Sequence, residues 1–214
     1  MDIELTPVEA RVLGALVEKS VTTPDYYPLS LNAVVNACNQ RSNRDPVVDY
    51  DDATVIRAID GLRDRGWTRL THTTGQRAVK YRHVLGDVLD LDDRALAVLA
   101  VLMLRGDQTP GELRTRTGRY IDFGSLEEVD EVLQGLIERD LAVRMDRRPG
   151  EKENRYRQLL GAASAPDTGP DLEDTQEPDE LEAAGLAERV EALEADVERL
   201  SADLRALRTA LGED

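Results

Sequence analysis

Apolar residues recur at helical spacing in two stretches of the chain that lie 86 positions apart. The matched residues are Val12, Leu13, Leu16 and Val17 in the first stretch, and Val98, Leu99, Leu102 and Met103 in the second. Side chains three and four positions apart share one face of a helix, so each stretch predicts a helix. Thr6 ahead of Pro7 is a typical cap for the first helix, and Asp92 is typical for the second.

Two further sets of matches follow in the same order along the chain. The first set pairs Val55, Ile59, Gly61, Leu62, Arg65 and Trp67 with Val129, Leu133, Gly135, Leu136, Arg139 and Leu141. The second set pairs Tyr81, Arg82, Val84 and Leu85 with Tyr156, Arg157, Leu159 and Leu160. Three matches in one order indicate that a unit of structure occurs twice. Ser125 and Glu128 have the spacing of a capping box, which starts a helix in the second copy.

Each copy predicts three helices, the middle one short, followed by a β-hairpin. In the first copy we expect the later helices at 30–39 and 51–65, and strands at 67–72 and 76–84. In the second copy we expect the middle helix from Thr109 and the hairpin on either side of 148–150. This order is the winged-helix arrangement. The sequence therefore predicts a mainly α protein with small β-hairpins (α+β), with tandem winged-helix domains at 1–86 and 87–160.

The rest of the chain divides into an acidic segment and a heptad segment. Residues 161–180 are rich in Asp, Glu and Pro without periodicity, which predicts a disordered linker. Residues 181–214 predict a coiled-coil helix, because apolar residues alternate spacings of four and three. They are Leu186, Val190, Leu193, Val197, Leu200, Leu204, Leu207 and Leu211. This seam favours dimerisation, and the alternative is a helix that folds back onto the domains.

The charge of the chain is concentrated in the acidic tail. The net charge is −16 at pH 7, of which residues 161–214 contribute −12 and residues 1–86 contribute nothing. The overall acidity therefore does not exclude nucleic acid as a partner of the first copy.

The chain carries few residue types that support catalysis or metal binding. Cys38 lies on the apolar face of a short predicted helix, and the histidines are His72 and His83 on the predicted strands. These residues do not form a metal-ligand cluster, and no phosphate-binding or nucleophile motif is present. We therefore expect a protein that is not an enzyme and has no cofactor or metal. The absence of a signal sequence or a long apolar run predicts a cytoplasmic protein without membrane contact.

In winged-helix proteins that bind DNA, the third helix enters the major groove and basic side chains contact phosphates, so the third helix and the hairpin of each copy are the candidate DNA-binding surfaces. The third helix of the second copy is strongly acidic, which opposes contact with phosphates. In the first copy, basic and amide side chains occupy the loop after the middle helix, the third helix and the hairpin. They are Asn39, Gln40, Arg41, Asn43, Arg44, Arg57, Arg69, Arg77, Lys80 and Arg82. The alternative for Asn39, Ser42 and Asn43 is that they cap helices and shape a turn.

Two long motifs resemble a known family. Residues 5–14 (LTPVEARVLG) and 38–47 (CNQRSNRDPV) are similar to the YceH-like family of bacterial proteins. The resemblance extends over essentially the whole chain and implies a tandem winged-helix fold. It brings no established activity, cofactor or ligand.

Two functions from different classes fit these patterns. The first is a dimeric regulator that binds double-stranded DNA through the loop and hairpin of the first copy. The second is an adaptor that uses acidic winged-helix domains to bind a protein partner, without direct DNA binding. The basic first hairpin favours DNA, whereas the acidic third helix of the second copy favours the adaptor.

Overall fold

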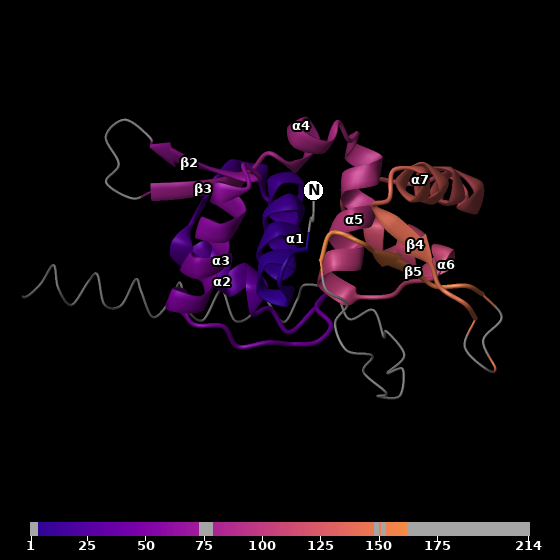
Figure 1. The fold of residues 1–214 in the computed structure, drawn as a ribbon, viewed down its shortest axis with the longest axis horizontal. Coiled ribbons are helices and arrows are strands. Elements are labelled where there is room, and N and C mark those ends of the chain that lie inside the picture. The colour runs from indigo at the N-terminus through magenta and orange to yellow at the C-terminus, as the bar shows by residue number, and fades with distance from the viewer. Residues whose placement is uncertain (1–3, 73–78, 148–149, 151–152, 162–214) are drawn as a thin grey trace, which may run out of the picture. The chain divides into compact units, whose positions relative to one another are not determined.

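Two helices that are buried on all sides, one from each copy, lie against each other in the middle of the fold. In the computed structural model, which describes residues 4–72, 79–147, 150 and 153–161, they are α1 (Pro7–Thr22) and α5 (Asp93–Arg105) (Figure 1). Residues 9–18 of α1 and 97–104 of α5 are all buried. A helix without an exposed face must be surrounded by other elements. The two copies therefore share one hydrophobic core.

The close contact between α1 and α5 depends on a glycine of α1. Gly14 of α1 corresponds to Ala100 of α5 at the offset of 86. A Cβ atom built on Gly14 would lie 3.0 Å from Cγ of Leu104 and 3.1 Å from Cβ of Met103. The absence of a side chain at Gly14 therefore allows the two helices to approach closely.

The first copy has the order of elements that the apolar pattern predicts. After α1 come α2 (Leu31–Cys38), α3 (Asp52–Asp64), β2 (Thr68–His72) and β3 (Val79–His83). Thr6 caps α1 in a full capping box with Glu9, and Ser30 and Asp51 cap α2 and α3. Each capping side chain accepts a hydrogen bond from a backbone N–H of the first turn that has no partner within the helix.

The second copy repeats this order with shorter strands. It contains α5, α6 (Pro110–Thr117), α7 (Leu126–Glu138), β4 (Ala142–Arg144) and β5 (Tyr156–Gln158). Asp92, Thr109 and Ser125 cap the three helices. The capping box predicted for Ser125 and Glu128 is only half formed. The Glu128 carboxylate instead accepts a bond from the Gly124 N–H and pairs with Arg94.

Three short elements were not predicted. They are the 3₁₀ helix η1 (Pro24–Tyr26), strand β1 (Leu29–Ser30) and helix α4 (Leu85–Leu89). Strand β1 pairs antiparallel with β3, so the first sheet has the order β1-β3-β2, and the second sheet contains β4 and β5. Elements of two to five residues are too short to show a hydrophobic period, which explains why the pattern misses them.

The beginning and the end of the described fold meet. The Leu5 N–H donates to the Leu160 carbonyl at 2.7 Å, and Leu5 forms a parallel bridge with Gly161. A Cβ at Gly161 would lie 2.8 Å from the Leu5 carbonyl oxygen, so this approach requires glycine. The first copy is thereby bonded directly to the residues that follow β5 in the second copy.

The observed fold is mainly helical with small antiparallel hairpins, as predicted. Both copies belong to one compact unit, and the predicted boundary between residues 86 and 87 falls inside α4. The winged-helix assignment stays an interpretation of this order of elements. The predicted linker beyond Gly161 and the coiled-coil helix lie outside the described residues.

Candidate nucleic-acid interface

Basic side chains of the first hairpin share one face of the sheet. Arg69 of β2 is directly opposite Arg82 of β3, and Thr71 of β2 is opposite Lys80 of β3. Successive residues of a strand point to opposite faces, so these two pairs lie on the same face. Ser30 of β1 is opposite Lys80 on its other side. We call the surface formed by Arg69, Lys80 and Arg82 the cationic hairpin face.

The cationic hairpin face has no internal counter-charge. Within the part of the chain that the structure describes, none of its three basic side chains forms a hydrogen bond or an ion pair. Like charges directly opposite each other on neighbouring strands destabilise a sheet. The Arg69–Arg82 pair therefore favours an external anion. Arg77, also predicted for this surface, lies outside the described residues.

The opposite face of the hairpin is anchored to α1 through His83. The His83 N–H donates to Oη of Tyr27 at 2.7 Å, and Nε2 of His83 lies 3.1 Å from Oγ of Ser20. Burial lowers the pKa of His83 to about 4, with a smaller effect in the same direction from Arg82. His83 is therefore neutral at pH 7 and acts as a structural anchor. Neither Tyr27 nor Ser20 carries a sequence signal that would have identified this role.

Several polar side chains of the loop between α2 and α3 form hydrogen bonds or ion pairs within the protein. The Arg44 side chain has an exposed fraction of 0% and forms a two-pronged ion pair with Glu18, which is equally buried. Arg44 also donates to the carbonyl oxygens of Ala37 and Asn43 and to Oε1 of Gln40. The prediction that Arg44 contacts nucleic acid therefore needs correction, because its guanidinium does not reach the surface.

Asn39 and Asn43 also stabilise this loop. The Asn39 side chain forms two hydrogen bonds with the backbone of Tyr50, at 2.9 Å each. Its Nδ2 donates to the Tyr50 carbonyl oxygen, and its Oδ1 accepts from the Tyr50 N–H. The Asn43 side chain accepts a bond from Arg105 at the end of α5, and Asn43 has a φ of 56°, which asparagine tolerates. The alternative interpretation of these asparagines, in which they shape the chain locally, explains these contacts. We therefore leave them out of the interface.

The remaining predicted residues do not join one surface. Arg41 is exposed, Gln40 is partly buried, and Arg57 is exposed on α3, where it donates to Thr54. Figure 1 shows the segment that joins α2 and α3 passing below the helices, whereas β2 and β3 lie above them. The structure thus brings Arg69, Lys80 and Arg82 together and separates them from the loop. Thr71 and Ser30 were missed, although Thr71 follows Arg69 at the strand period of two.

The buried carboxylate of Glu18 links the loop between α2 and α3 to the second copy. The carboxylate of Glu18 on α1 forms the ion pair with Arg44 described above. It also accepts a hydrogen bond from Oη of Tyr120 at 3.0 Å and forms an ion pair with Arg119 at 3.4 Å. Burial by itself would raise the pKa of Glu18, but the bond and charge of Arg44 outweigh it, and the pKa lies below its ordinary value. This cluster connects α1 with the segment after α6. The Glu18 carboxylate at its centre is fully buried and already paired, so the cluster acts as a structural element.

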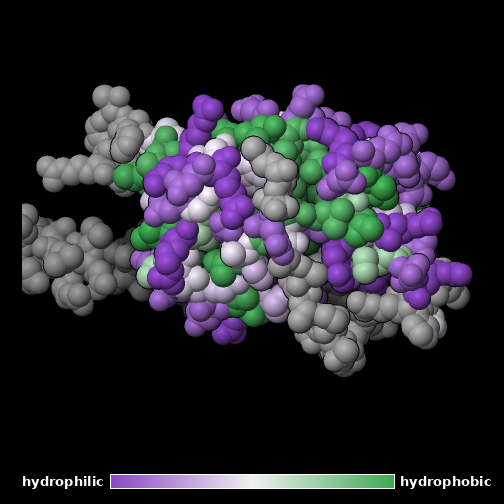
Figure 2. All heavy atoms as spheres, viewed as in Figure 1, coloured by the Kyte–Doolittle hydropathy of each residue, from purple (hydrophilic) through white to green (hydrophobic). Residues whose placement is uncertain are grey.

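The third helices differ in charge on their exposed faces. On α7, Glu127, Asp130, Glu131 and Glu138 are exposed, and Figure 2 shows a hydrophilic surface in this region of the molecule. On α3, the exposed Arg57 and Arg63 stand beside Asp52 and Asp64. Repulsion from phosphates is therefore expected at α7, and little net attraction is expected at α3.

The described residues form neither a reactive thiol site nor a cluster of metal ligands. Cys38 is fully buried, and burial raises the pKa of its thiol to about 12, so it is not a reactive thiolate at neutral pH. Within the described ranges, no three His, Cys, Asp or Glu side chains gather as metal ligands. No helix in the same ranges combines the length and apolarity needed to cross a bilayer.

Comparison with known proteins identifies relatives over most of the chain. Residues 5–151 match the family model described as "Protein of unknown function, DUF480". The UPF0502 protein of Geotalea daltonii is 48% identical over 196 residues, which cover 91% of this chain and 88% of that protein. The UPF0502 protein of Pelobacter propionicus is 45% identical over 215 residues, which cover 100% of this chain and 97% of that protein. The similarity thus includes both copies of the repeat.

Proposed function

The chain belongs to the DUF480 family of bacterial proteins, and we propose that it is a non-enzymatic winged-helix protein that binds double-stranded DNA. The observation that carries the proposal is the pairing of Arg69 with Arg82, beside Lys80, on one face of the first hairpin. In this interpretation the hairpin is the wing, and its cationic face contacts the phosphate backbone.

The physical basis of the proposal is the relief of repulsion by a bound polyanion. Neighbouring strands lie about 4.8 Å apart, so the three charges of the cationic hairpin face occupy a small area. Double-stranded DNA presents about one negative charge per 1.7 Å of its axis, and basic side chains that neutralise phosphates release bound counterions. Both effects favour association, and both weaken as salt is added.

The same surface implies little discrimination between DNA sequences. Contacts with phosphates position a protein on DNA but do not read bases. Base reading would fall to α3, whose exposed basic side chains, Arg57 and Arg63, are offset by neighbouring carboxylates. We therefore expect affinity to depend more on salt than on sequence.

The test is binding of the full chain to a duplex of about 30 base pairs with no chosen sequence, measured by fluorescence anisotropy between 50 and 200 mM NaCl. Replacing Arg69, Lys80 and Arg82 by Ala should weaken binding at least about ten-fold at the lowest salt concentration. The slope of log affinity against log salt should fall by about 1 for each lost phosphate contact.

A matched control removes the same charge elsewhere. Arg114, Arg144 and Arg147 are exposed on the second copy, away from the cationic hairpin face and α3, so their replacement by Ala should leave the salt slope nearly unchanged. An equal loss in both triple variants would show a general charge effect and contradict the assignment. Absence of binding by the unmodified protein at 50 mM salt would refute DNA binding itself.

Self-association through residues 181–214 is the second part of the proposal. The apolar seam at Leu186, Val190, Leu193 and the following heptad positions supports a two-stranded coiled coil. A dimer would present two cationic hairpin faces to one DNA molecule. Two linked contacts bind more tightly than one where the geometry allows both to be engaged.

An adaptor that binds a protein is the second candidate, and the exposed acidic face of α7 favours it. Glu127, Asp130, Glu131 and Glu138 would repel DNA and attract a basic partner surface. This candidate predicts no DNA binding at low salt. It also predicts that Glu131→Lys and Glu138→Lys together abolish capture of the partner without reducing the stability of the protein.

A further inference from the structure

The pairing of the strands aligns the two copies residue by residue around their hairpins. Leu29 lies opposite Tyr81 of β3, and Gln108 forms the equivalent antiparallel bridge with Tyr156 of β5. The next residue in each copy caps the middle helix, α2 or α6. Residues at the start of these two helices therefore correspond at an offset of 79, and residues of β3 and β5 correspond at an offset of 75.

The second copy pairs two basic residues of its hairpin with its own carboxylates. Arg157 of β5 donates to both carboxylate oxygens of Asp107, at 2.7 Å each. Arg155, two positions earlier, donates to the carboxylate of Glu112 on α6 at 2.9 Å. The exposed fractions of these four side chains lie between 13% and 26%, so both ion pairs are partly shielded from water. The charge on this hairpin is thus balanced within the protein.

The first copy has the equivalent basic residues but lacks both carboxylates. The counterparts of the two arginines are Lys80 and Arg82, as the offset of 75 requires. Ala33 occupies the position of the glutamate, third after the helix cap in both copies, and Pro28 occupies the position of the aspartate. Within the described residues, Lys80 and Arg82 form no hydrogen bond or ion pair. The first copy therefore presents the same two cations without anions to balance them.

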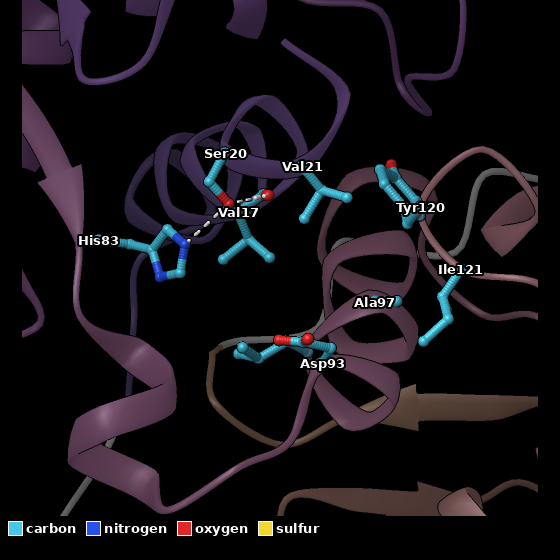
Figure 3. A pocket seen from close by; sticks show the side chains of 9 residues that line it. Val17, Ser20, Val21, His83, Asp93, Ala97, Tyr120 and Ile121 are labelled. Atoms are coloured by element: carbon cyan, nitrogen blue, oxygen red, sulfur yellow. Dashed lines mark hydrogen bonds between the residues drawn. The ribbon is translucent and has the colours of Figure 1, made fainter. Parts of the chain in front are cut away.

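The contact of β3 with α1 fixes the direction of these two cations. Nε2 of His83 lies 3.1 Å from Oγ of Ser20, and Figure 3 shows the imidazole beside this side chain of α1. Because successive residues of a strand point to opposite faces, Lys80 and Arg82 lie on the outer face of the sheet. They are two positions apart on one strand, so their Cα atoms are about 6.7 Å apart.

We propose that two phosphate groups of a bound DNA strand occupy, on the first copy, the positions that the two carboxylates occupy on the second. One phosphate accepts hydrogen bonds from Arg82 beside Pro28, and the other accepts from Lys80 beside Ala33. Arginine and lysine bind phosphate oxygens as they bind carboxylate oxygens, so a carboxylate position of one copy suits a phosphate in the other. This inference rests on the proposed DNA binding and states where the phosphates lie.

The test supplies the first copy with the carboxylate that it lacks. In Ala33→Glu the new side chain has the capping-box spacing from Ser30, so the variant should fold. Its carboxylate should pair with Lys80 and exclude the phosphate. In anisotropy titrations of the full chain with a DNA duplex, the affinity at 50 mM NaCl should fall at least about three-fold. The slope of log affinity against log salt should fall by about 1.

Three controls separate this pairing from a general effect of charge. Ala33→Gln has the same size without the charge and should bind DNA as the unmodified protein does. Asn36→Glu adds the charge to an exposed position of α2 one turn later, and it should leave the salt slope unchanged. In a Lys80→Ala background, Ala33→Glu should weaken binding no more than Asn36→Glu does, because the pairing cation is absent.

The second phosphate position is tested independently by Pro28→Asp, with Pro28→Asn as its uncharged match. The aspartate variant should pair with Arg82 and lower the salt slope by about 1, whereas the asparagine variant should not. Circular dichroism confirms that each variant is folded.

The possible failures point to different conclusions. Equal affinity and salt slope in Ala33→Glu and Ala33→Gln would overturn the phosphate positions and leave DNA binding intact. An equal loss in Ala33→Glu and Asn36→Glu would show general repulsion and would also contradict the positions. Absence of DNA binding by the unmodified protein at 50 mM NaCl would refute the proposed function, and the phosphate positions with it.

Discussion

At the scale of single residues, the burial of His83 gives the protein a defined sensitivity to acid. The pKa of His83 is about 4 in the folded protein and near 6.5 when the side chain is exposed. Between these two values the unfolded chain binds a proton that the folded chain does not. The free energy of unfolding therefore falls as the pH falls from 6.5 to 4, and it is constant with respect to this group above 6.5.

We expect the His83→Gln variant to lose this dependence. The contribution of His83 over the window is up to about 3 kcal/mol, from a shift of about 2.5 pKa units. Urea denaturation at half-unit steps from pH 4 to 7.5 gives the two stability curves. Other titrating groups affect both proteins equally, so the difference between the curves isolates His83. Parallel curves would show that His83 takes up its proton at the same pH in the folded and unfolded states.

Arg44 and Arg41 are neighbours in the loop with opposite environments. Removing one partner of a buried ion pair leaves the other charge without compensation, so Arg44→Met should cost about 3–5 kcal/mol. Arg41 is exposed, and Arg41→Met should change stability by about 0.5 kcal/mol or less. Chemical denaturation followed by circular dichroism measures both. Equal effects would show that the Arg44–Glu18 pair is not maintained in solution.

The sequence alone does not separate these two arginines. Both stand in a loop of donors, and the partner of Arg44, Glu18, lies 26 positions earlier on α1. Burial of a long charged side chain is decided by such distant partners, which local patterns do not reveal. The sequence places Arg69, Lys80 and Arg82 on the hairpin, where the structure also has them, because strands follow from local patterns, and the register of β2 with β3 then puts them on one face.

At the scale of elements, the predicted helices and strands follow from periodic apolar positions and capping residues. Helix α3 buries Val55, Ala58, Ile59 and Leu62, which form the stripe that the pattern indicates. The pairing of α1 with α5 was not predicted, although its signal is present. Continuous apolar runs, such as 97–104, leave no solvent face and require a partner on each side.

Gly14 offers a direct test of this pairing. In Gly14→Val the added atoms would press on Leu104 and Met103, and we expect a cost of about 1–3 kcal/mol from overpacking. Gly135 also lies in a helix, α7, but a Cβ there meets nothing within 4 Å. Gly135→Val should be neutral or slightly stabilising, because valine has a better helix propensity than glycine. Similar thermal stabilities of the two variants would contradict the close approach of α1 and α5.

At the scale of the whole molecule, the proposal of a coiled coil at residues 181–214 concerns how many copies of the repeat act together. The coiled-coil proposal predicts a dimer in sedimentation equilibrium. Replacing Leu193 and Leu200 by Asp should give a monomer, because charges at these positions would be buried in the seam. Arg189→Ala, beside the seam, should leave the dimer nearly intact, since an exposed pair contributes little. A dimer that survives both leucine replacements would locate the contact elsewhere.

The meeting of Leu5 with Leu160 and Gly161 has a consequence for the order of the two copies in the gene. Because the outer ends of the tandem adjoin, a short connection could join them, and new termini could open in the exposed segment around Asp90 and Asp92. The second copy would then precede the first. The contacts of the shared core would be the same in such a circular permutant, because they depend on the proximity of α1 and α5 and not on which is synthesised first.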